Sequence, residues 1–267
     1  MGLRMARGKQ IWLGCAAVLW LGLNGASVSA SWSEPVRVAA AADLRFALAE
    51  VQALFSQVHP EASVEIIYGS SGRFRTQIEH GAPFDLYFSA DIAYPRALQS
   101  AGLVVGDVMP YALGRLVLWS NTVDASAVTL INLDQAVFRR IAIANPRHAP
   151  YGARAEEALR AVGLWNRISD RLVLGESAAQ ALQMVQSGAA EVGVVPLSLA
   201  LNPAVAAEGG YHLIDAALHA PLLQGFVVTR RAADKATALA FAEFMRRPEV
   251  RAILDRYGFE TPTMRAS

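Results

Sequence analysis

Short apolar runs alternate with helical patterns along most of the chain, beginning at residue 36. The run 36–42 is short and almost wholly apolar. After it, Leu44, Leu48 and Val51 recur at helical spacing. Repetition of this order predicts an α/β fold in which mostly parallel strands are flanked by helices. We expect strands at 36–42, 63–68, 84–88, 116–119, 141–144, 172–174, 192–195 and 223–229, and helices at 91–99, 152–162, 177–186, 232–246 and 249–257.

Two sheets of this kind fit the length of the chain. About 237 residues follow residue 30, enough for one large domain or two smaller ones. Two α/β sheets predict two lobes with a ligand cleft between them. In such sheets ligands lie at the carboxyl ends of strands, where helices begin. The junctions that stand out are 42–43, 69–72 and 175–178, together with the proline-containing loop 145–152.

The junction at 69–72 has the sequence Gly-Ser-Ser-Gly between a strand and a helix. The helix is expected to end near Gly81 and Pro83. Ser70 and Ser71 therefore lie at a helix N-terminus, where free backbone N–H groups, hydroxyl groups and the positive end of the helix dipole can hold an anion. The alternative is an ordinary turn with a serine N-cap.

The first 30 residues are typical of a secretory signal peptide. Arg4, Arg7 and Lys9 precede an apolar run at 11–23, and small residues lead to an expected cleavage after Ala30. This apolar run is shorter than the roughly 20 residues that span a bilayer. The chain is therefore expected to be secreted across a membrane and not anchored in it.

Removal of this peptide also removes the single cysteine, Cys15, so we expect no disulfide and no thiol chemistry. The remaining chain has 21 basic and 23 acidic residues, which gives no basic surface for nucleic acid. The histidines have no metal-ligand spacing, and no free metal cation is expected. The sequence has neither a Gly-x-Ser-x-Gly motif nor a histidine–carboxylate cluster, so a binding protein is favoured over an enzyme on the same fold.

Several motifs in a fixed order resemble the periplasmic molybdate-binding proteins that supply ABC transporters. They are Ala-Ala-Ala-Asp-Leu at 40–44, Gly-Ser-Ser-Gly at 69–72, Gln-Ile-Glu-His-Gly-Ala-Pro at 77–83, Phe-Ser-Ala-Asp at 88–91, Asn-Pro-Arg-His-Ala-Pro-Tyr-Gly at 145–152 and Arg-Tyr-Gly-Phe at 256–259. The resemblance covers about residues 36–259.

The resemblance implies a two-lobed periplasmic-binding-protein fold, each lobe a mostly parallel sheet flanked by helices. One lobe would comprise 31–115 and 226–267, and the other 116–225. The implied function is capture of molybdate, and of tungstate, by a monomer without a cofactor, followed by delivery to an ABC transporter permease. The alternative ligand is another tetrahedral oxyanion such as sulfate or phosphate.

The resemblance also implies the ligand contacts. The family's serine in the second turn corresponds to Ser71, and its contact in the first turn corresponds to Ala42 or Asp43. A loop position that is tyrosine in one branch corresponds to Tyr151. The position after the fourth turn corresponds to Ala178, which would act through its backbone N–H. Neutral hydrogen-bond donors would thus hold the molybdate oxyanion.

Two of the site residues keep alternative roles. Asp43 stands where the family offers a neutral donor, and an ionised aspartate repels a dianion. Asp43 is therefore either an N-cap whose backbone N–H faces the ligand, or an acceptor for a protonated oxyanion. Ser70 either contacts the ligand or shapes the turn.

Overall fold

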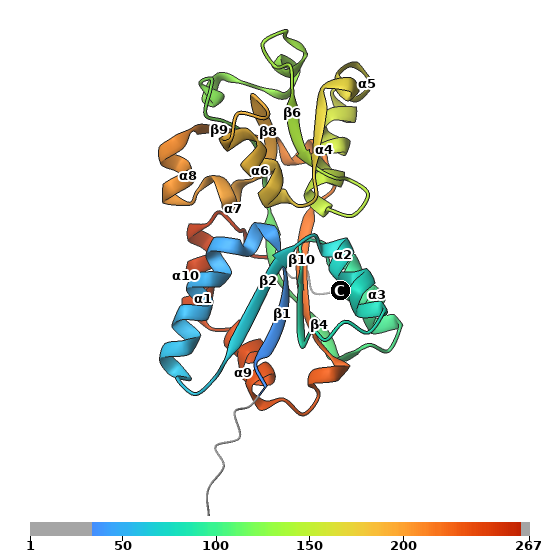
Figure 1. Cartoon of the computed structure of the whole chain (residues 1–267), viewed down its shortest axis with the longest axis vertical. Coiled ribbons are helices and arrows are strands. Elements are labelled where there is room, and N and C mark those ends of the chain that lie inside the picture. Colours follow the sequence, from blue (N-terminus) through green and yellow to red (C-terminus); the bar gives the residue numbers. More distant parts are fainter. Residues whose placement is uncertain (1–33, 263–267) are drawn as a thin grey trace, which may run out of the picture. The chain divides into compact units, whose positions relative to one another are not determined.

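The computed structural model describes residues 34–262, and the expected signal peptide at 1–30 lies outside this range. The described chain is built around two five-stranded sheets, each with helices packed against it (Figure 1). The strand order is β2-β1-β3-β10-β4 in the first sheet and β7-β6-β8-β5-β9 in the second. This is the two-sheet α/β arrangement that the sequence predicts.

In the first sheet, β1 pairs in parallel with β2 and β3, whereas β10 pairs antiparallel with β3 and β4. Four of its five strands therefore run in the same direction, and β10 runs against them. The prediction of a mostly parallel sheet holds in this sense. The strands are β1 (Val36–Ala41), β2 (Val64–Gly69), β3 (Leu86–Ser89), β4 (Val104–Gly114) and β10 (Leu222–Thr229).

The second sheet repeats this pattern. The strand β6 pairs in parallel with β7 and β8, and β5 pairs antiparallel with β8 and β9. Again one strand, here β5, runs against the other four. The strands are β5 (Leu116–Ser120), β6 (Ile141–Ala144), β7 (Leu172–Gly175), β8 (Val192–Pro196) and β9 (Gly210–Leu213).

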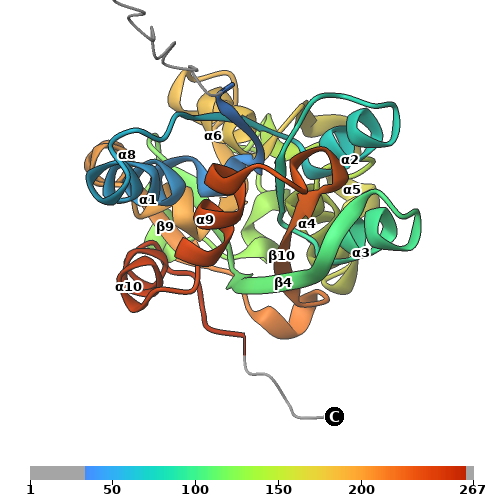
Figure 2. The same ribbon diagram turned by 90° about the horizontal axis from the view of Figure 1, so that it is seen from below.

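Helices cover both sheets. In both ribbon views α1 and α10 lie on one side of the first sheet, and α2 and α3 lie on the other (Figure 1, Figure 2). The helices α4 and α6 pack against strands of the second sheet. The α-helices are α1 (Arg45–Val58), α2 (Ser71–Glu79), α3 (Ala93–Ser100), α4 (Pro150–Ala161), α5 (Trp165–Ile168), α6 (Ala178–Gln186), α7 (Leu197–Ala200), α8 (Pro203–Glu208), α9 (Ala236–Phe244) and α10 (Pro248–Arg256).

Two connections join the sheets. The strand β4 ends at Gly114 and β5 begins at Leu116, so Arg115 alone separates a strand of the first sheet from a strand of the second. The chain returns to the first sheet through β10, which pairs with β4 from Leu222 onward. The first sheet therefore receives segments from both ends of the described chain.

The sequence did not predict β4, β9 or the short helices α5, α7 and α8. The strand β4 contains Gly106, Asp107 and Pro110, and its early residues are exposed, so it lacks the apolar run that marks a buried strand. It forms because β10 pairs with it along seven residue positions, with irregularities in register. Pairing partners distant in sequence thus override a weak local pattern.

Each sheet has its own core. Phe88 and Phe226 stack at 4.7 Å between ring centroids on neighbouring strands of the first sheet, and Trp119 is fully buried in the second. No helix in residues 34–262 combines the length and apolar character needed to cross a membrane.

Candidate functional site

Segments from both sheets meet at one small cavity, and the six residues selected from the sequence all line it. Ala42 and Asp43 follow β1, and Ser70 and Ser71 follow β2. Tyr151 and Ala178 lie in the first turns of helices that pack against the second sheet. The lining residues are Ala41, Ala42, Asp43, Gly69, Ser70, Ser71, Ala90, Ala149, Pro150, Tyr151 and Ala178.

Three helices begin at this cavity. Ser71 is the first residue of α2, Pro150 of α4 and Ala178 of α6. The N–H group of a first helical residue has no partner inside its own helix, so the N–H groups of Ser71 and Ala178 are available to a ligand. The helix dipoles add a positive potential at the same ends. The cavity is therefore suited to an anion, although no arginine or lysine of the described chain lines it.

The Ser71 side chain can donate its hydroxyl hydrogen to a ligand. Its Oγ accepts the N–H of Ala90 at 3.1 Å, and its backbone carbonyl accepts the hydroxyl of Tyr87 at 2.7 Å. Ser71 is 1% exposed. Because these contacts use Oγ only as an acceptor, the hydroxyl hydrogen remains for the cavity.

Asp43 does not form the N-cap that the sequence suggested as one alternative. Ala41 occupies the N-cap of the 3₁₀ turn η1 (Ala42–Leu44), and the turn has no side-chain cap. The Asp43 carboxylate instead accepts Nε2 of Gln224 through Oδ2 at 2.7 Å. Asp43 is thus the middle residue of the turn and not its N-cap, and its side chain meets a buried amide on β10.

Burial shapes the chemistry of this carboxyl group. Loss of solvent raises the pKa of Asp43 from 3.8 to about 6, and hydrogen bonding from Gln224 and Tyr151 opposes this rise. The other carboxylate oxygen, Oδ1, has no hydrogen-bond partner among the described residues. Asp43 is therefore a buried hydrogen-bond acceptor in the lining of the cavity.

Sequence reasoning missed Gln224, which links the two sides of the cavity. Its Nε2 donates to Asp43 and, at 3.1 Å, to the hydroxyl oxygen of Tyr151. Its Oε1 accepts the hydroxyl of Tyr111 at 2.6 Å. Gln224 is fully buried. A single amide inside the otherwise apolar run 222–228 is a signal that could have marked this position, because buried amides need partners.

Tyr151 is held between the two sheets, where its hydroxyl group neighbours the Asp43 carboxylate. The ring is 3% exposed and belongs to the core of the second lobe. Since its oxygen accepts from Gln224, the hydroxyl hydrogen can be donated to Asp43 or to a ligand. Burial, followed by the charge of Asp43, raises the pKa of Tyr151 well above its usual range, so the phenol stays protonated.

Gly114, at the end of β4, allows this arrangement. A Cβ atom at this position would lie 2.2 Å from the Tyr151 hydroxyl and 2.7 Å from Gln224 Nε2. Both distances are shorter than van der Waals contact allows. The connection between the sheets therefore needs glycine where it passes the polar cluster.

Ser70 contacts the opposite side of the cavity. It is the N-cap of α2, and its Oγ donates to the carbonyl of His148, while the N–H of Gly72 donates to the same carbonyl at 2.9 Å. These contacts tie the serine turn to the loop before α4. They use the Ser70 hydroxyl hydrogen, which favours the turn-shaping role for Ser70.

Ion pairs join the same two regions at the protein surface. Arg73 on α2 pairs with Glu176, and His148 lies 3.7 Å from the same carboxylate. Burial, followed by the charge of Arg73, lowers the pKa of His148. Arg75 pairs instead with Glu79 on its own helix, at 2.8 Å. Arg73 thus connects the two sides, whereas Arg75 stays on a solvated helix face.

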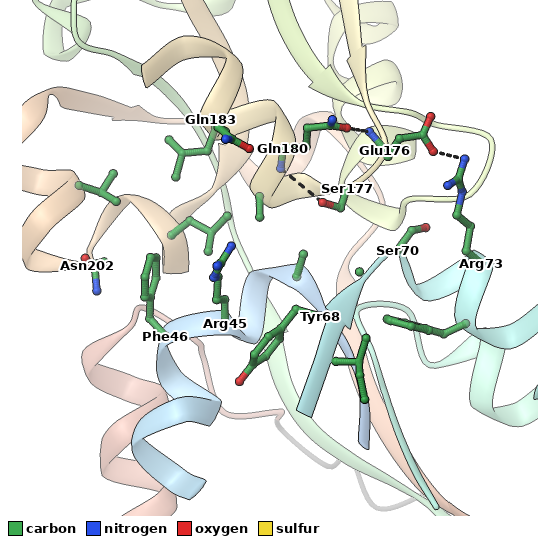
Figure 3. A pocket seen from close by; sticks show the side chains of 18 of the residues that line it. Arg45, Phe46, Tyr68, Ser70, Arg73, Glu176, Ser177, Gln180, Gln183 and Asn202 are labelled. Carbon is green, nitrogen blue, oxygen red and sulfur yellow. Dashed lines mark hydrogen bonds and ion pairs between the residues drawn. The ribbon is translucent and has the colours of Figure 1, made fainter. Parts of the chain in front are cut away.

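A groove of about 860 Å³ opens beside the cavity and shares Ala42, Gly69 and Ser70 with it. Arg73 and Glu176 meet at one end of the groove, and Arg45 and Asn202 lie toward the other (Figure 3). The cavity itself measures about 10 Å³, close to the space of one water molecule.

Metal-binding side chains do not gather here. In the part of the chain that the structure describes, no group of three or more histidine, cysteine, aspartate or glutamate side chains could hold a metal ion. The cavity offers hydroxyls, backbone N–H groups and one carboxylate. This donor set suits the oxygens of an oxyanion better than a free cation.

The comparisons with known proteins agree on one family. The profile of the bacterial extracellular solute-binding proteins matches residues 36–260. The chain is 34% identical to the molybdate-binding protein ModA of Rhodobacter capsulatus over 88% of this chain and 87% of the relative. It is 33% identical to ModA of Azotobacter vinelandii over 88% of this chain and 93% of the relative.

Solved structures show the same fold. The periplasmic molybdate-binding protein of Azotobacter vinelandii superposes with a TM-score of 0.78 at 33% identity, covering 85% of this chain and 99% of that one. The sulfate-binding protein SubI of Mycobacterium tuberculosis superposes with a TM-score of 0.71 at 14% identity, covering 86% of this chain and 87% of that one, which shows a shared fold alone. The chain therefore belongs to the bacterial extracellular solute-binding proteins and, within them, to the ModA family.

Proposed function

We propose that the protein captures molybdate, and also tungstate, in the periplasm and delivers it to an ABC transporter permease. The observation that carries the proposal is the single cavity lined by all six residues that the family motifs select. The relatives from Rhodobacter capsulatus and Azotobacter vinelandii are named for molybdate binding. Binding without chemical turnover is part of the proposal.

The proposed ligand contacts come from both sheets. Ser71 and the turn Ala42–Asp43 belong to the first, and Tyr151 and the N–H of Ala178 belong to the second. Neutral donors and helix N-termini can replace the water around an oxyanion without a fixed cation. A ligand that contacts both sheets favours the arrangement in which they are close together.

We further propose that the expected signal peptide at 1–30 directs the chain to the periplasm and that the mature protein acts as a monomer. One lobe would contain 31–115 and 226–267, and the other 116–225. Two observations support this division: Arg115 alone separates β4 from β5, and β10 pairs with the first sheet from Leu222 onward.

Calorimetric titration of the mature chain with molybdate, tungstate, sulfate and phosphate tests this function. Molybdate and tungstate should bind, and Ser71→Ala should weaken both because it removes a hydroxyl donor from the cavity. Ser56→Ala is the matched control, since Ser56 is exposed and its hydroxyl donates to Gln52 on its own helix. Absence of heat and of thermal stabilisation with molybdate would contradict the proposal.

A second candidate ligand is a protonated oxyanion such as hydrogen phosphate. The free Oδ1 of Asp43 favours it, because a carboxylate can accept the hydrogen of such a ligand. The phosphate arm of the same titration distinguishes the two. Tighter binding of phosphate than of molybdate would select this second candidate.

A further inference from the structure

We propose that binding of a doubly charged oxyanion takes up one proton, which is held between Asp43 Oδ1 and the ligand. The inference rests on the proposed function and specifies the charge of the bound state. It makes Asp43 a specificity-determining residue that acts as a donor once the ligand arrives.

The position of the carboxyl group is fixed by a chain of hydrogen bonds. Tyr111 donates to Oε1 of Gln224 at 2.6 Å, which turns the Gln224 amide nitrogen toward Asp43. The opposite orientation would set a carbonyl oxygen against a carboxylate. Gln224 then binds Oδ2 at 2.7 Å, so rotation of the carboxyl group would cost this contact.

The remaining oxygen, Oδ1, is the atom that can carry the proton. It is buried and has no hydrogen-bond partner among the described residues, although the Tyr151 hydroxyl and the backbone N–H groups of Asp43 and Leu44 lie close enough to lower the pKa of the carboxyl group. Asp43 is 1% exposed and lines the cavity beside Ser71 and Tyr151. A protonated Oδ1 would add a fourth donor to those of Ser71, Tyr151 and Ala178.

The groups facing Asp43 leave few other places for the proton. Tyr151 on α4 and Tyr111 on β4 are the titratable neighbours, and burial, reinforced by the Asp43 charge, raises the pKa of each well above its usual range. Gln224 on β10 and Ser198 on α7 are neutral, and the Ser198 hydroxyl donates to the Asp43 carbonyl at 2.8 Å.

The nearby groups that can carry charge have other partners. His148 contacts Ser70, and Glu176 contacts Arg73, on the far side of the serine turn.

The bound state would therefore contain an O–H···O hydrogen bond in place of two facing anions. An ionised Asp43 repels a dianion in a buried site whose described lining contains no arginine or lysine. A proton from water removes this repulsion and converts an acceptor into a donor. Burial already raises the pKa of Asp43 to about 6 in the free protein, so the proton is readily taken up near neutral pH.

Titration calorimetry with molybdate at pH 6, 7 and 8 tests the inference. In two amine buffers of different ionisation enthalpy, the wild-type protein should take up about half a proton at pH 6 and about one at pH 8. The dissociation constant should rise about fiftyfold between pH 6 and pH 8, as expected for a site with a pKa of about 6 that binds only when protonated.

Asp43→Asn should bind molybdate with no proton uptake and a dissociation constant that is independent of pH. Asp107→Asn is the matched control, because Asp107 is exposed on β4, and it should behave as the wild type. If Asp43→Asn does not fold, Asp43→Ser replaces it, and the proton count of the wild type is decisive by itself.

The experiment separates failure of the proton inference from failure of the proposed function. Molybdate binding without proton uptake at pH 8 would overturn the inference and leave the proposed function intact. Proton uptake that persists in Asp43→Asn would also overturn it, by placing the proton elsewhere. Absence of molybdate binding at every pH would overturn the proposed function itself.

Discussion

The carboxyl group of Asp43 is buried and bonded to Gln224, and its burial makes the stability of the fold depend on pH. Its pKa rises from 3.8 to about 6 on folding because burial disfavours the ionised form. A raised carboxyl pKa stabilises the fold fully below pH 3.8, and this contribution is lost as the pH rises through about 6. The ligand-free protein should therefore lose about 3 kcal/mol over this interval through Asp43.

Replacement of this residue by asparagine should remove that loss. The free energy of unfolding of ligand-free Asp43→Asn, relative to the wild type, should increase from pH 4 to pH 7 and stay constant above it. Urea unfolding at several pH values measures the difference, with Asp107→Asn as control. A difference that does not change with pH would show that the wild-type carboxyl titrates normally.

Tyr151 should act mainly through its hydroxyl group. The hydroxyl oxygen accepts from Gln224 at 3.1 Å, and its hydrogen is available to a ligand. Tyr151→Phe should weaken molybdate binding by about tenfold to a hundredfold, because a hydrogen bond to a charged group contributes about 1.5–3 kcal/mol. Tyr68→Phe removes a phenol that lines the groove and has no partner among the described residues, so it should leave the affinity unchanged. Equal effects of both changes would argue against a ligand contact at Tyr151.

At the scale of elements, the end of β4 passes so close to the polar cluster that a side chain does not fit. Gly114→Ala would put a methyl group within 2.2 Å of the Tyr151 hydroxyl and should displace Tyr151 and Gln224. We expect a loss of about 1–3 kcal/mol in stability and weaker molybdate binding. Gly210→Ala is the control in the second sheet, since its Cβ would meet nothing nearer than Ala125 N at 4.0 Å. Thermal unfolding and calorimetry should separate the two variants.

The sequence predicted most elements that have a strong pattern of their own. A recognisable local pattern marks the apolar runs that become β1, β6 and β8, and also the helix after the serine turn. In contrast, β4 has glycine, aspartate and proline in its interior, and its strand form depends on β10. Local pattern could not reveal a strand that distant pairing creates.

The candidate site also has residues that local motifs reveal and residues whose role depends on distant parts of the chain. Helix N-termini at Ser71 and Ala178 follow from the order of strands, turns and helices, so motif spacing was sufficient to find them. The role of Asp43 was not predictable, because it depends on Gln224, which lies 181 residues away in the chain. The folded sheet order puts β10 beside β3, and this brings the two residues together.

At the scale of the whole molecule, a substitution at Gly72 should have opposite effects on the helix α2 and on the contact between the two sides of the cavity. It lies in the first turn of α2, where alanine is a better helix former by about 1 kcal/mol. A Cβ atom there would lie 2.6 Å from the carbonyl of His148, which belongs to the second-sheet side of the cavity. Alanine therefore suits the helix and opposes the contact between the two sides.

Gly72→Ala should accordingly weaken molybdate binding while ligand-free stability is kept or increased by up to about 1 kcal/mol. The affinity falls because only the fraction of molecules with both sides in contact can bind fully. Calorimetry gives the affinity, and small-angle scattering with and without saturating molybdate reports whether the ligand still makes the molecule more compact. Unchanged affinity would mean that the contact between Gly72 and His148 is not needed for binding. A large loss of ligand-free stability would mean that this contact already exists before the ligand arrives.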